Sequence, residues 1–337
     1  MKINNIFEQL INRQDLTSSQ MEDFMQACMT GELSDAQIAA FLALIRMKGE
    51  TVLELTSAAQ MMIKFAHPID LGANLIDIVG TGGDGKNTFN VSTISAFVAA
   101  AAGASVAKHG GASVSSKSGS ANLLEQAGFK LNLTDKQLEQ CMQQCKISFL
   151  YAPHFHPALA HAKNARQQLG IRTLFNFLGP LVNPARVKRQ VVGVFAKSWL
   201  EPLAQVLANL GSLRVFVINS RDGMDEVSIS AITDVVEYHQ GEFKKWTINP
   251  EEYGCFHPKI EGIIVDSPQQ SLALAQDLLK GKPGPARDIV LLNAALALYC
   301  GEFAINFEDA LTKAKEAIDS FEAARRFEQL RESTNHD

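Results

Sequence analysis

The chain has 337 residues, of which 46% are hydrophobic and 20% are charged, and this balance excludes a mainly disordered chain or a long coiled coil. The length is sufficient for two domains. The formal net charge is −5, with 31 basic and 36 acidic residues mixed along the sequence, which argues against a protein that coats nucleic acid.

Residues 1–66 have the pattern of a helical bundle. Apolar residues recur at helical spacing in the first eleven positions. Thr17 and Ser34 each stand three residues before a glutamine, which is typical of capping boxes at helix starts. A further helix is expected from Thr51 to about residue 65, because Pro68 disfavours helix at the residue before it.

Nothing in this sequence indicates export or insertion into a membrane. The first helix is not followed by a small-residue cleavage site, and the longest apolar run, 94–107, is too short to span a bilayer. The five cysteines include Cys141 and Cys145, but no second Cys or His pair at zinc-ligand spacing accompanies them. We therefore expect reduced, packing cysteines in a cytoplasmic protein with no membrane partner.

The pattern changes at Leu75, where short strand-like runs begin to alternate with helical segments. This alternation predicts a mostly parallel sheet covered by helices, with a helical tail over 267–330 and a loop at 281–287 within it. The expected fold class is therefore α/β, with a small all-helical domain and a large α/β domain. The expected division is a helical domain at 1–70, with 167–186 packed against it, and an α/β domain formed by 71–166 and 187–337. The strand-like runs are 75–80, 104–108, 147–151, 191–196 and 215–219.

The glycine-rich loop GTGGDG, residues 80–85, follows the first strand-like run. Clustered glycines allow backbone N–H groups to converge on an anion. The loop fits the dinucleotide pattern G-x-G-x-x-G, but the acidic residue expected about 20 positions later is missing. It also resembles a Walker loop, except that Asn87 replaces the Ser/Thr that would hold magnesium. We favour a phosphate-binding loop of another type.

Two further segments carry groups that suit an anion. Asn90-Val91-Ser92-Thr93 begins a helix, where hydroxyls, N–H groups and the helix dipole favour negative charge. Lys108 ends a strand-like run and precedes a serine-rich loop, and a cation at a strand's carboxyl end suits a phosphate or a carboxylate.

Asp225 and Glu226 are the candidate metal ligands. Adjacent carboxylates near a phosphate site are a common way of holding Mg²⁺, which keeps several waters and substrate oxygens as its other ligands. Arg166 and Arg172 could each clamp a carboxylate or form a surface ion pair. The histidines at 154, 156 and 161 lack a fourth ligand for zinc, so we expect caps or substrate contacts there.

Taken together, these segments resemble the anthranilate phosphoribosyltransferase family, which shares its fold with nucleoside phosphorylases. The order and spacing of the motifs agree over nearly the whole chain. The matching stretches are GTGGDG (80–85), NVST (90–93), KHG…SVSSKSGS (108–120), QQLGIRTLFNFLGPLVNP (167–184) and GMDEVS (223–228).

The resemblance implies attack of the anthranilate amine on C1 of phosphoribosyl pyrophosphate (PRPP), with release of pyrophosphate, in tryptophan biosynthesis. It implies a homodimer formed through the helical domains, and two Mg²⁺ ions held by Ser92, Asp225 and Glu226. Anthranilate would meet Gly80, His109 and Arg166, and no residue would act as an acid or base. The implied PRPP-binding residues are Gly80, Gly83, Asp84, Thr88, Asn90, Val91, Ser92, Thr93, Lys108, Ser113, Ser116 and Ser120.

The sequence departs from the family pattern beside these residues. Gly111-Ala112 stands where the family has Asn and usually Arg, and Asn122 stands where it has Asp. Loss of the asparagine amide would remove a hydrogen bond to anthranilate, which costs roughly 1.5–3 kcal/mol for a charged partner. The departures therefore bear on the identity of the acceptor, or on the efficiency with which it is used, rather than on donor binding.

Two alternatives of the same fold remain open. A pyrimidine nucleoside phosphorylase would use inorganic phosphate and a nucleoside, and it would leave the Asp225-Glu226 pair without a role. A non-catalytic relative that binds nucleic acid would need a basic face and degraded donor loops, whereas the net charge is negative and the loops are intact. We therefore expect small-molecule substrates and no nucleic-acid partner.

Overall fold

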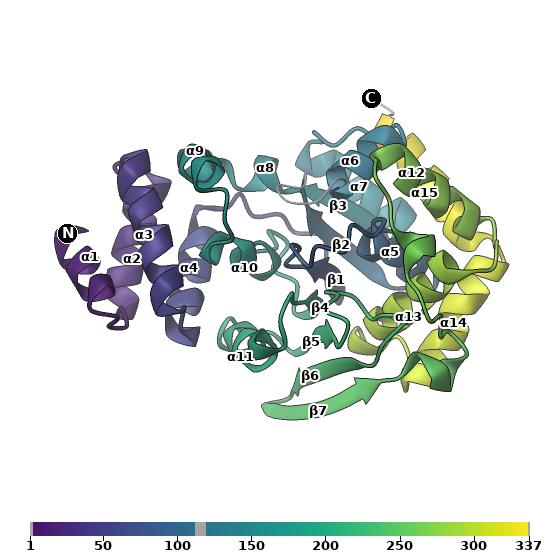
Figure 1. Cartoon of the computed structure of the whole chain (residues 1–337). Helices are drawn as coiled ribbons and strands as arrows, with labels where there is room; N and C mark the ends of the chain where they lie inside the picture. The colour runs from purple at the N-terminus through teal and green to yellow at the C-terminus, as the bar shows by residue number, and fades with distance from the viewer. Residues whose placement is uncertain (1–2, 112–118, 336–337) are drawn as a thin grey trace.

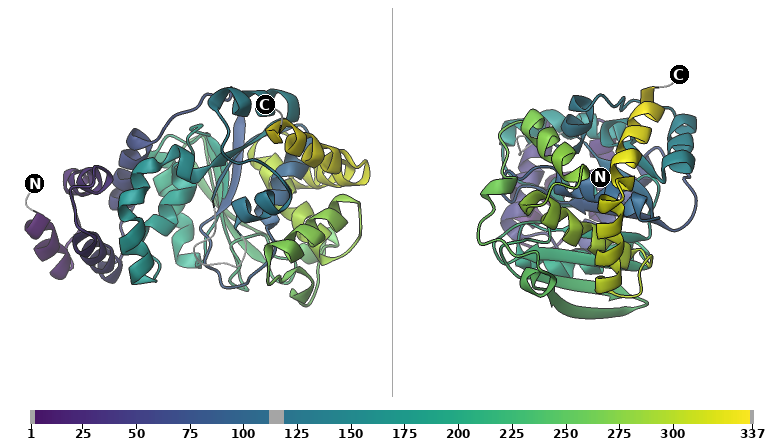
Figure 2. Two further views of the ribbon diagram at one scale, coloured as in Figure 1. Left: turned by 90° about the horizontal axis from the view of Figure 1, so that it is seen from above. Right: turned by 90° about the vertical axis from the view of Figure 1, so that its right-hand side faces the viewer.

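The computed structural model describes residues 3–111 and 119–335. The N-terminal helices lie at one end of the molecule, the sheet lies in the middle, and the C-terminal helices lie at the other end (Figures 1 and 2). The four N-terminal helices are α1 (Ile3–Ile11), α2 (Ser18–Met29), α3 (Asp35–Lys48) and α4 (Val52–Phe65).

The expected capping boxes are confirmed. The Thr17 hydroxyl accepts a hydrogen bond from Gln20 N, while the Gln20 side chain accepts one from Thr17 N. Ser34 forms the same pair with Gln37 at the start of α3. Each box satisfies two N–H groups that have no partner inside the helix. Local sequence therefore sets where these helices begin.

The central sheet contains seven strands among the described residues, in the order β3-β2-β1-β4-β5-β6-β7. The first five in that order are parallel, whereas β6 and β7 pair antiparallel with their neighbours. The mostly parallel sheet is thus confirmed. The strands are β1 (Leu75–Gly80), β2 (Ser105–Gly110), β3 (Ile147–Tyr151), β4 (Arg189–Gly193), β5 (Arg214–Ser220), β6 (Thr233–His239) and β7 (Glu242–Ile248).

Helices cover both faces of this sheet (Figure 2). Because successive strand residues point to opposite faces, Val191 and Phe216 join one buried cluster and Val192 and Val215 join another. The second cluster also contains the bundle helices, α9 (Ala160–Leu169), α10 (Leu174–Leu181) and α11 (Leu200–Asn209). The first contains α5 (Val91–Ala101), α6 (Ser120–Gln126), α7 (Asp135–Cys145), α12 (Pro268–Leu279), α13 (Pro285–Cys300), α14 (Phe307–Asp319) and α15 (Glu322–Asn335).

Segment 167–186 lies between the two parts of the molecule. Its buried apolar side chains, including Leu174, Phe177 and Leu181, belong to the cluster that holds the bundle helices. The same cluster takes in one face of β4 and β5. We propose a division into a helical domain at 1–70, against which 167–186 packs, and an α/β domain of 71–166 and 187–337.

The main differences from expectation are two element boundaries and one hairpin. Helix α13 begins at Pro285, inside the segment expected to be a loop, because proline is favoured at the first helical position. Strand β4 ends at Gly193 rather than near residue 196. The hairpin of β6 and β7 was not expected. Its two-residue turn at Gln240 and Gly241 has φ of 52° and 88°, as the twist of a tight hairpin requires.

The five cysteines are free and buried, as expected. Burial raises the pKa of Cys28 and Cys300 to about 12, so these thiols are inert packing groups. In the described part of the chain, no helix combines the length and the apolar character that crossing a membrane requires.

Candidate active site

The candidate site lies at the carboxyl ends of the parallel strands, where ligands of such sheets usually bind. Gly80 at the end of β1 pairs with Gly193 at the end of β4. Thr81 N then donates to Gly193 O at 2.8 Å, which turns the chain into the glycine-rich loop. The sequence therefore places GTGGDG at the sheet edge where two neighbouring strands end.

Loop 80–85 needs glycine for two different reasons. Gly82, Gly83 and Gly85 have φ of 67°, 78° and 75°, a region that side chains rarely adopt. Position 80 has no room for a side chain, since a Cβ there would lie 2.5 Å from Asp225 Oδ2. Gly82 N donates to the same oxygen at 2.8 Å. The loop and the segment containing Asp225 are therefore in direct contact.

Three carboxylates crowd together at this contact. Burial, and then the charge of Asp84, raise the pKa of Asp225 to about 7. Burial, and then the charge of Asp225, raise the pKa of Glu226 well above its usual value. Ser92 N donates to Glu226 Oε1 at 3.1 Å, which joins the start of α5 to the same group. Burial therefore disfavours the ionised form of both carboxyls, and the charge of Lys108 partly offsets this effect at Glu226.

These residues fit a divalent cation. Asp84 Oδ2 and Thr93 Oγ1 are buried and have no hydrogen-bond partner in the part of the chain that the structure describes. Hard oxygen donors and repelling carboxylates are what Mg²⁺ would satisfy. Within residues 3–111 and 119–335, no three acidic, histidine or cysteine side chains converge as a complete ligand set. Such a set is unnecessary for Mg²⁺, which relies on waters and substrate phosphates.

The segment carrying Asp225 and Glu226 is held firmly from outside. The Asn293 side chain, on α13, accepts from Val227 N at 2.9 Å and donates to Val227 O at 3.0 Å. Ser228 and Ser230 both donate to Asp222 Oδ2, at 2.6 and 2.8 Å. Buried hydrogen bonds of this kind fix a backbone. The two carboxylates are therefore presented on a rigid turn.

Lys108 and His109 are buried near the end of β2. Lys108 Nζ donates to Ile78 O at 2.6 Å, and burial lowers its pKa although Asp77 and Glu226 oppose that shift. His109 is buried, and burial followed by the proximity of His156 lowers its pKa to about 3. Its Nε2 has no partner among the described residues. His109 is therefore a neutral imidazole with a free nitrogen.

Asn183 connects segment 167–186 to β1 and β2, the strands that end at the candidate site. Its Nδ2 donates to Asp77 Oδ2 on β1 and to Ala107 O on β2, each at 2.8 Å. Burial raises the pKa of Asp77, while Lys108 and the Asn183 bond act in the opposite direction. A single buried amide thus ties the link between the two parts of the molecule to the strands that end in the site.

The two candidate arginines have different surroundings. Arg166 on α9 packs over the Phe175 ring, with Cζ 5.0 Å from the ring centre. Arg172 lies against the donor loop, because a Cβ at Gly83 would be 2.8 Å from Arg172 Nε. Its Cζ also lies 4.2 Å from the ring centre of Phe195, a cation–π distance. The structure thus places Arg172 closest to the glycine-rich loop.

The remaining predicted residues lie around the same edge. Ser271 Oγ donates to Asn90 Oδ1 at 2.8 Å, so α12 holds the start of α5. Ser120 Oγ donates to Gly111 O at 3.3 Å. Thr88 forms an isolated bridge with Ile264, and Val91 is buried in the first turn of α5. Ser113 and Ser116 lie outside the described residues.

Sequence reasoning brought together Gly80, Asp84, Ser92, Asp225 and Glu226, and the structure places them at one edge. It did not find the supporting roles of Asp77, Asn183, Asp222 and Asn293. Asn183 and Asn293 form hydrogen bonds with residues 106 and 66 positions away in the sequence, and Asp222 accepts hydrogen bonds within a turn. A local sequence pattern does not reveal such contacts. Arg172 was noticed as an arginine, but its contact with Gly83 could not be inferred.

The whole chain is similar to known proteins. Residues 72–324 match the glycosyl transferase family, a/b domain, and residues 4–66 match that family's helical bundle domain. Anthranilate phosphoribosyltransferase from Legionella pneumophila (strain Paris) is 64% identical over 331 residues, covering 98% of this chain and 96% of the relative.

Solved structures agree with this result. Anthranilate phosphoribosyltransferase from Thermus thermophilus has a TM-score of 0.91 at 36% identity, covering 98% of this chain and 99% of that one. The enzyme from Saccharomyces cerevisiae in complex with PRPP and Mg has a TM-score of 0.90 at 27% identity, covering 98% and 97%. The chain therefore belongs to the glycosyl transferase family and, within it, to the anthranilate phosphoribosyltransferases.

Proposed function

We propose that this chain transfers the phosphoribosyl group of PRPP to the amine of anthranilate, releasing pyrophosphate, as a step of tryptophan biosynthesis. The observation that carries the proposal is the contact of the glycine-rich loop with Asp225, which joins a phosphate cradle to a cation site. Family membership supports it, as does the yeast relative whose structure holds PRPP and Mg.

The donor binds where the loop, the start of α5 and the end of β2 meet. Ser92, Asp225 and Glu226 would hold two Mg²⁺ ions, which would supply positive charge to stabilise the leaving pyrophosphate. Residues assigned to the donor are Gly80, Gly83, Asp84, Thr88, Asn90, Val91, Ser92, Thr93, Lys108, Ser113, Ser116 and Ser120. We add Arg172 to these residues because its side chain lies against Gly83.

Catalysis here consists of positioning and of stabilising the leaving group. Negative charge develops on the pyrophosphate, where the loop N–H groups and the Arg172 guanidinium are preorganised to meet it. The aromatic amine is neutral at pH 7, so attack at C1 needs no strong base. No side chain is therefore assigned the role of acid or base, and correct alignment supplies much of the acceleration.

The acceptor side is built from Gly80, His109 and Arg166. Arg166 supplies a cation for the anthranilate carboxylate. His109 stays neutral at physiological pH because burial holds its pKa near 3, so it offers a hydrogen bond without a charge. Gly111 lies at the same strand end but has no side chain to contribute.

We further propose that the enzyme is a cytoplasmic homodimer formed through its helical domains. Met47 and Leu53 are 72% and 51% exposed at the corner where α3 passes to α4. Large apolar side chains exposed together are typical of an interaction surface.

The test is the loss of anthranilate fluorescence on mixing with PRPP, with and without Mg²⁺. A Mg²⁺-dependent loss is expected, and Asp225→Ala combined with Glu226→Ala should abolish it while the melting transition stays cooperative. Full activity in that variant would contradict the metal assignment. Phosphorolysis of uridine with inorganic phosphate, or retention on heparin without any turnover, would favour the two alternatives instead.

A further inference from the structure

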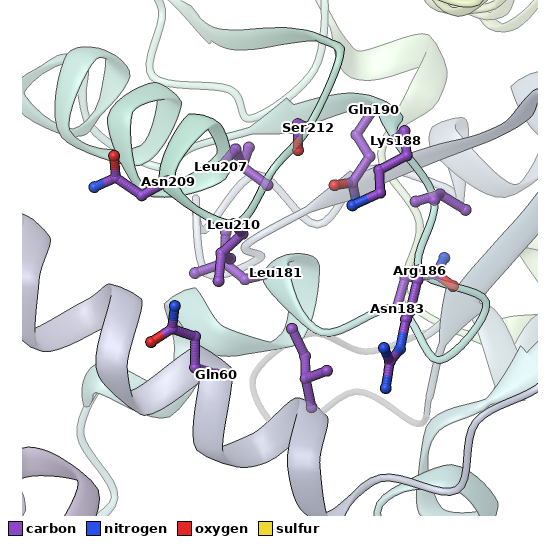
Figure 3. A pocket seen from close by; sticks show the side chains of 12 residues that line it. Gln60, Leu181, Asn183, Arg186, Lys188, Gln190, Leu207, Asn209, Leu210 and Ser212 are labelled. Atoms are coloured by element: carbon purple, nitrogen blue, oxygen red, sulfur yellow. The ribbon is translucent and has the colours of Figure 1, made fainter.

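A cavity lies at the opposite end of β4 from the candidate active site. Its volume is about 240 Å³, and it is formed where α4 meets the segment between α10 and β4 and the C-terminal end of α11 (Figure 3). At about 30 Å³ per water in the liquid, this is room for roughly eight waters or one small ring compound. The cavity adjoins the amino end of β4, whereas the donor loop adjoins its carboxyl end.

One wall of this cavity carries two cations. Arg186 and Lys188 both line it and are exposed to solvent, and neither side chain has an ion pair or a hydrogen bond with any described residue. No described lining residue is acidic. Lys188 Nζ lies over the end of α11, 3.5 Å from where a Cβ of Gly211 would stand. Two unpaired cations that line one concave surface favour an anionic ligand.

Buried polar groups form the base of the same cavity. Ser212, Gln190 and Asn183 are 8%, 3% and 4% exposed. The Ser212 hydroxyl has no partner among the described side chains and backbone groups. Gln190 Nε2 donates to Pro180 O at 3.0 Å, which leaves its carbonyl oxygen as an acceptor. The cavity thus offers hydroxyl and amide groups beside its two cations.

The opposite wall is mainly apolar, with Gln60 and Asn209 as its polar side chains. Leu181, Leu207, Leu210 and Ile63 line it, and Figure 3 shows Leu181 and Leu210 across from Arg186 and Lys188. An inorganic anion such as sulfate would leave this wall uncovered. A ligand with a charged end and an apolar body would contact both walls. Its charged end would pair with the cations, and its apolar body would pack against the leucines.

We propose that this cavity is a second binding site, for a small carboxylate with an apolar body. The carboxylate pairs with Arg186 and Lys188, and the apolar body lies against the leucines. The site contacts α4, α11 and Asn183, so its ligand binds both parts of the molecule at the link between them.

The test uses benzoate as the probe and isothermal titration calorimetry at constant ionic strength. Because benzoate could also enter the acceptor site, the experiment is done in Arg166→Gln, which removes that cation. One benzoate site is expected to remain. Arg186→Gly with Lys188→Gln should weaken it at least about tenfold, the effect of losing a charged hydrogen bond. Glycine is chosen at 186 because φ there is 50°.

Three controls complete the design. Lys136→Gln removes an exposed cation on α7 and should leave benzoate binding unchanged. Benzamide keeps the ring without the charge and should bind at least about tenfold more weakly. Sulfate should not compete at concentrations comparable with benzoate. Equal binding in the double variant, equal binding of benzamide, or efficient displacement by sulfate would each overturn the proposal. Lys188→Gln alone serves if the double variant melts early.

Discussion

At the scale of single residues, Gly111 is the clearest departure from the family pattern. A Cβ there would lie 3.6 Å from Ala152 Cβ and 3.9 Å from Pro153 Cδ, which are ordinary contacts, and its φ is not positive. Gly111→Asn should therefore fit and lower the Kd for anthranilate roughly tenfold. Fluorescence titration measures this change. Gly111→Ala is the control, and an equal gain from alanine would show that the amide is not responsible.

Arg172 is the residue whose role depends most on tertiary structure. If its guanidinium meets the donor phosphates above Gly83, Arg172→Gln should raise the KM for PRPP at least about tenfold and leave the KM for anthranilate nearly unchanged. Arg166→Gln should show the opposite split. Initial rates at varied concentrations of both substrates decide between them.

A purely structural role for Arg172 makes a different prediction. Its guanidinium also packs over Phe195, so loss of this contact alone would lower the melting temperature without changing either KM. Arg172→Lys keeps the charge but not the planar contact. A lower melting temperature in both variants with normal kinetics would contradict the assignment to the donor.

At the scale of elements, Asn183 joins segment 167–186 to β1 and β2. Asn183→Ala leaves the buried Asp77 Oδ2 and the Ala107 carbonyl without the amide that donates to them. A buried group left unsatisfied costs about 1–3 kcal/mol, so the free energy of unfolding should fall by about that amount. Urea denaturation measures it. Asn132→Ala, at an exposed position between α6 and α7, is the control, and an equal loss there would remove the special role of Asn183.

The buried histidine pair beside this link makes stability depend on pH. His156 Nε2 donates to Val182 O, 3.0 Å away, and burial lowers the pKa of this histidine to about 4. The unfolded chain therefore binds this proton first, near pH 6.5, and stability is lost as the pH falls from there towards 4. Between about pH 7.5 and 5, the wild type should lose about 1–2 kcal/mol more than His156→Gln.

Carboxyls whose pKa is raised, such as Asp77 and Asp225, change the stability with pH in the opposite direction. Both the wild type and His156→Gln contain these carboxyls, so their effect cancels in the comparison. His154→Gln removes an exposed histidine two positions away and serves as the control. Unfolding curves at the two pH values give the result. Parallel pH dependence in the wild type and His156→Gln would contradict the buried, neutral state of His156.

Elements were predictable from sequence where local rules decide them. The boxes at Thr17 and Ser34 set helix starts, and the apolar run 75–80 became β1 without change. The hairpin of β6 and β7 was missed because β7 is largely exposed and carries Lys244 and Lys245, so it lacks a buried apolar face. Its only local signal was the Gln240-Gly241 turn.

The site was predictable to a different extent. Glycine spacing and the Asp225-Glu226 pair carry chemistry in their residue types, so sequence alone indicated a phosphate and cation site. The contacts of Asn183 and Asn293 with distant backbone, and of Arg172 with Gly83, depend on how the chain folds back on itself. Such contacts leave no local pattern, so they had to come from the structure.

At the scale of the whole molecule, the proposed dimer can be tested apart from catalysis. Met47 and Leu53 form an apolar corner of the helical domain, so Met47→Glu with Leu53→Glu should convert a dimer into a monomer, because burying two carboxylates without partners is unfavourable. Light scattering after gel filtration measures the mass. Ile305→Glu changes an 87% exposed side chain between α13 and α14 and should leave the dimer intact.

The monomeric variant also addresses where the active site is formed. The contacts that Asp225 makes with Gly80 and Gly82, and that Glu226 makes with Ser92, are formed within a single chain. A folded monomer should therefore keep its Mg²⁺-dependent turnover. If turnover disappears while the melting transition stays cooperative, association must fix the link between the bundle and the sheet. A double variant that stays dimeric would place the interface outside this corner, and a wild type that is monomeric would contradict the proposed dimer.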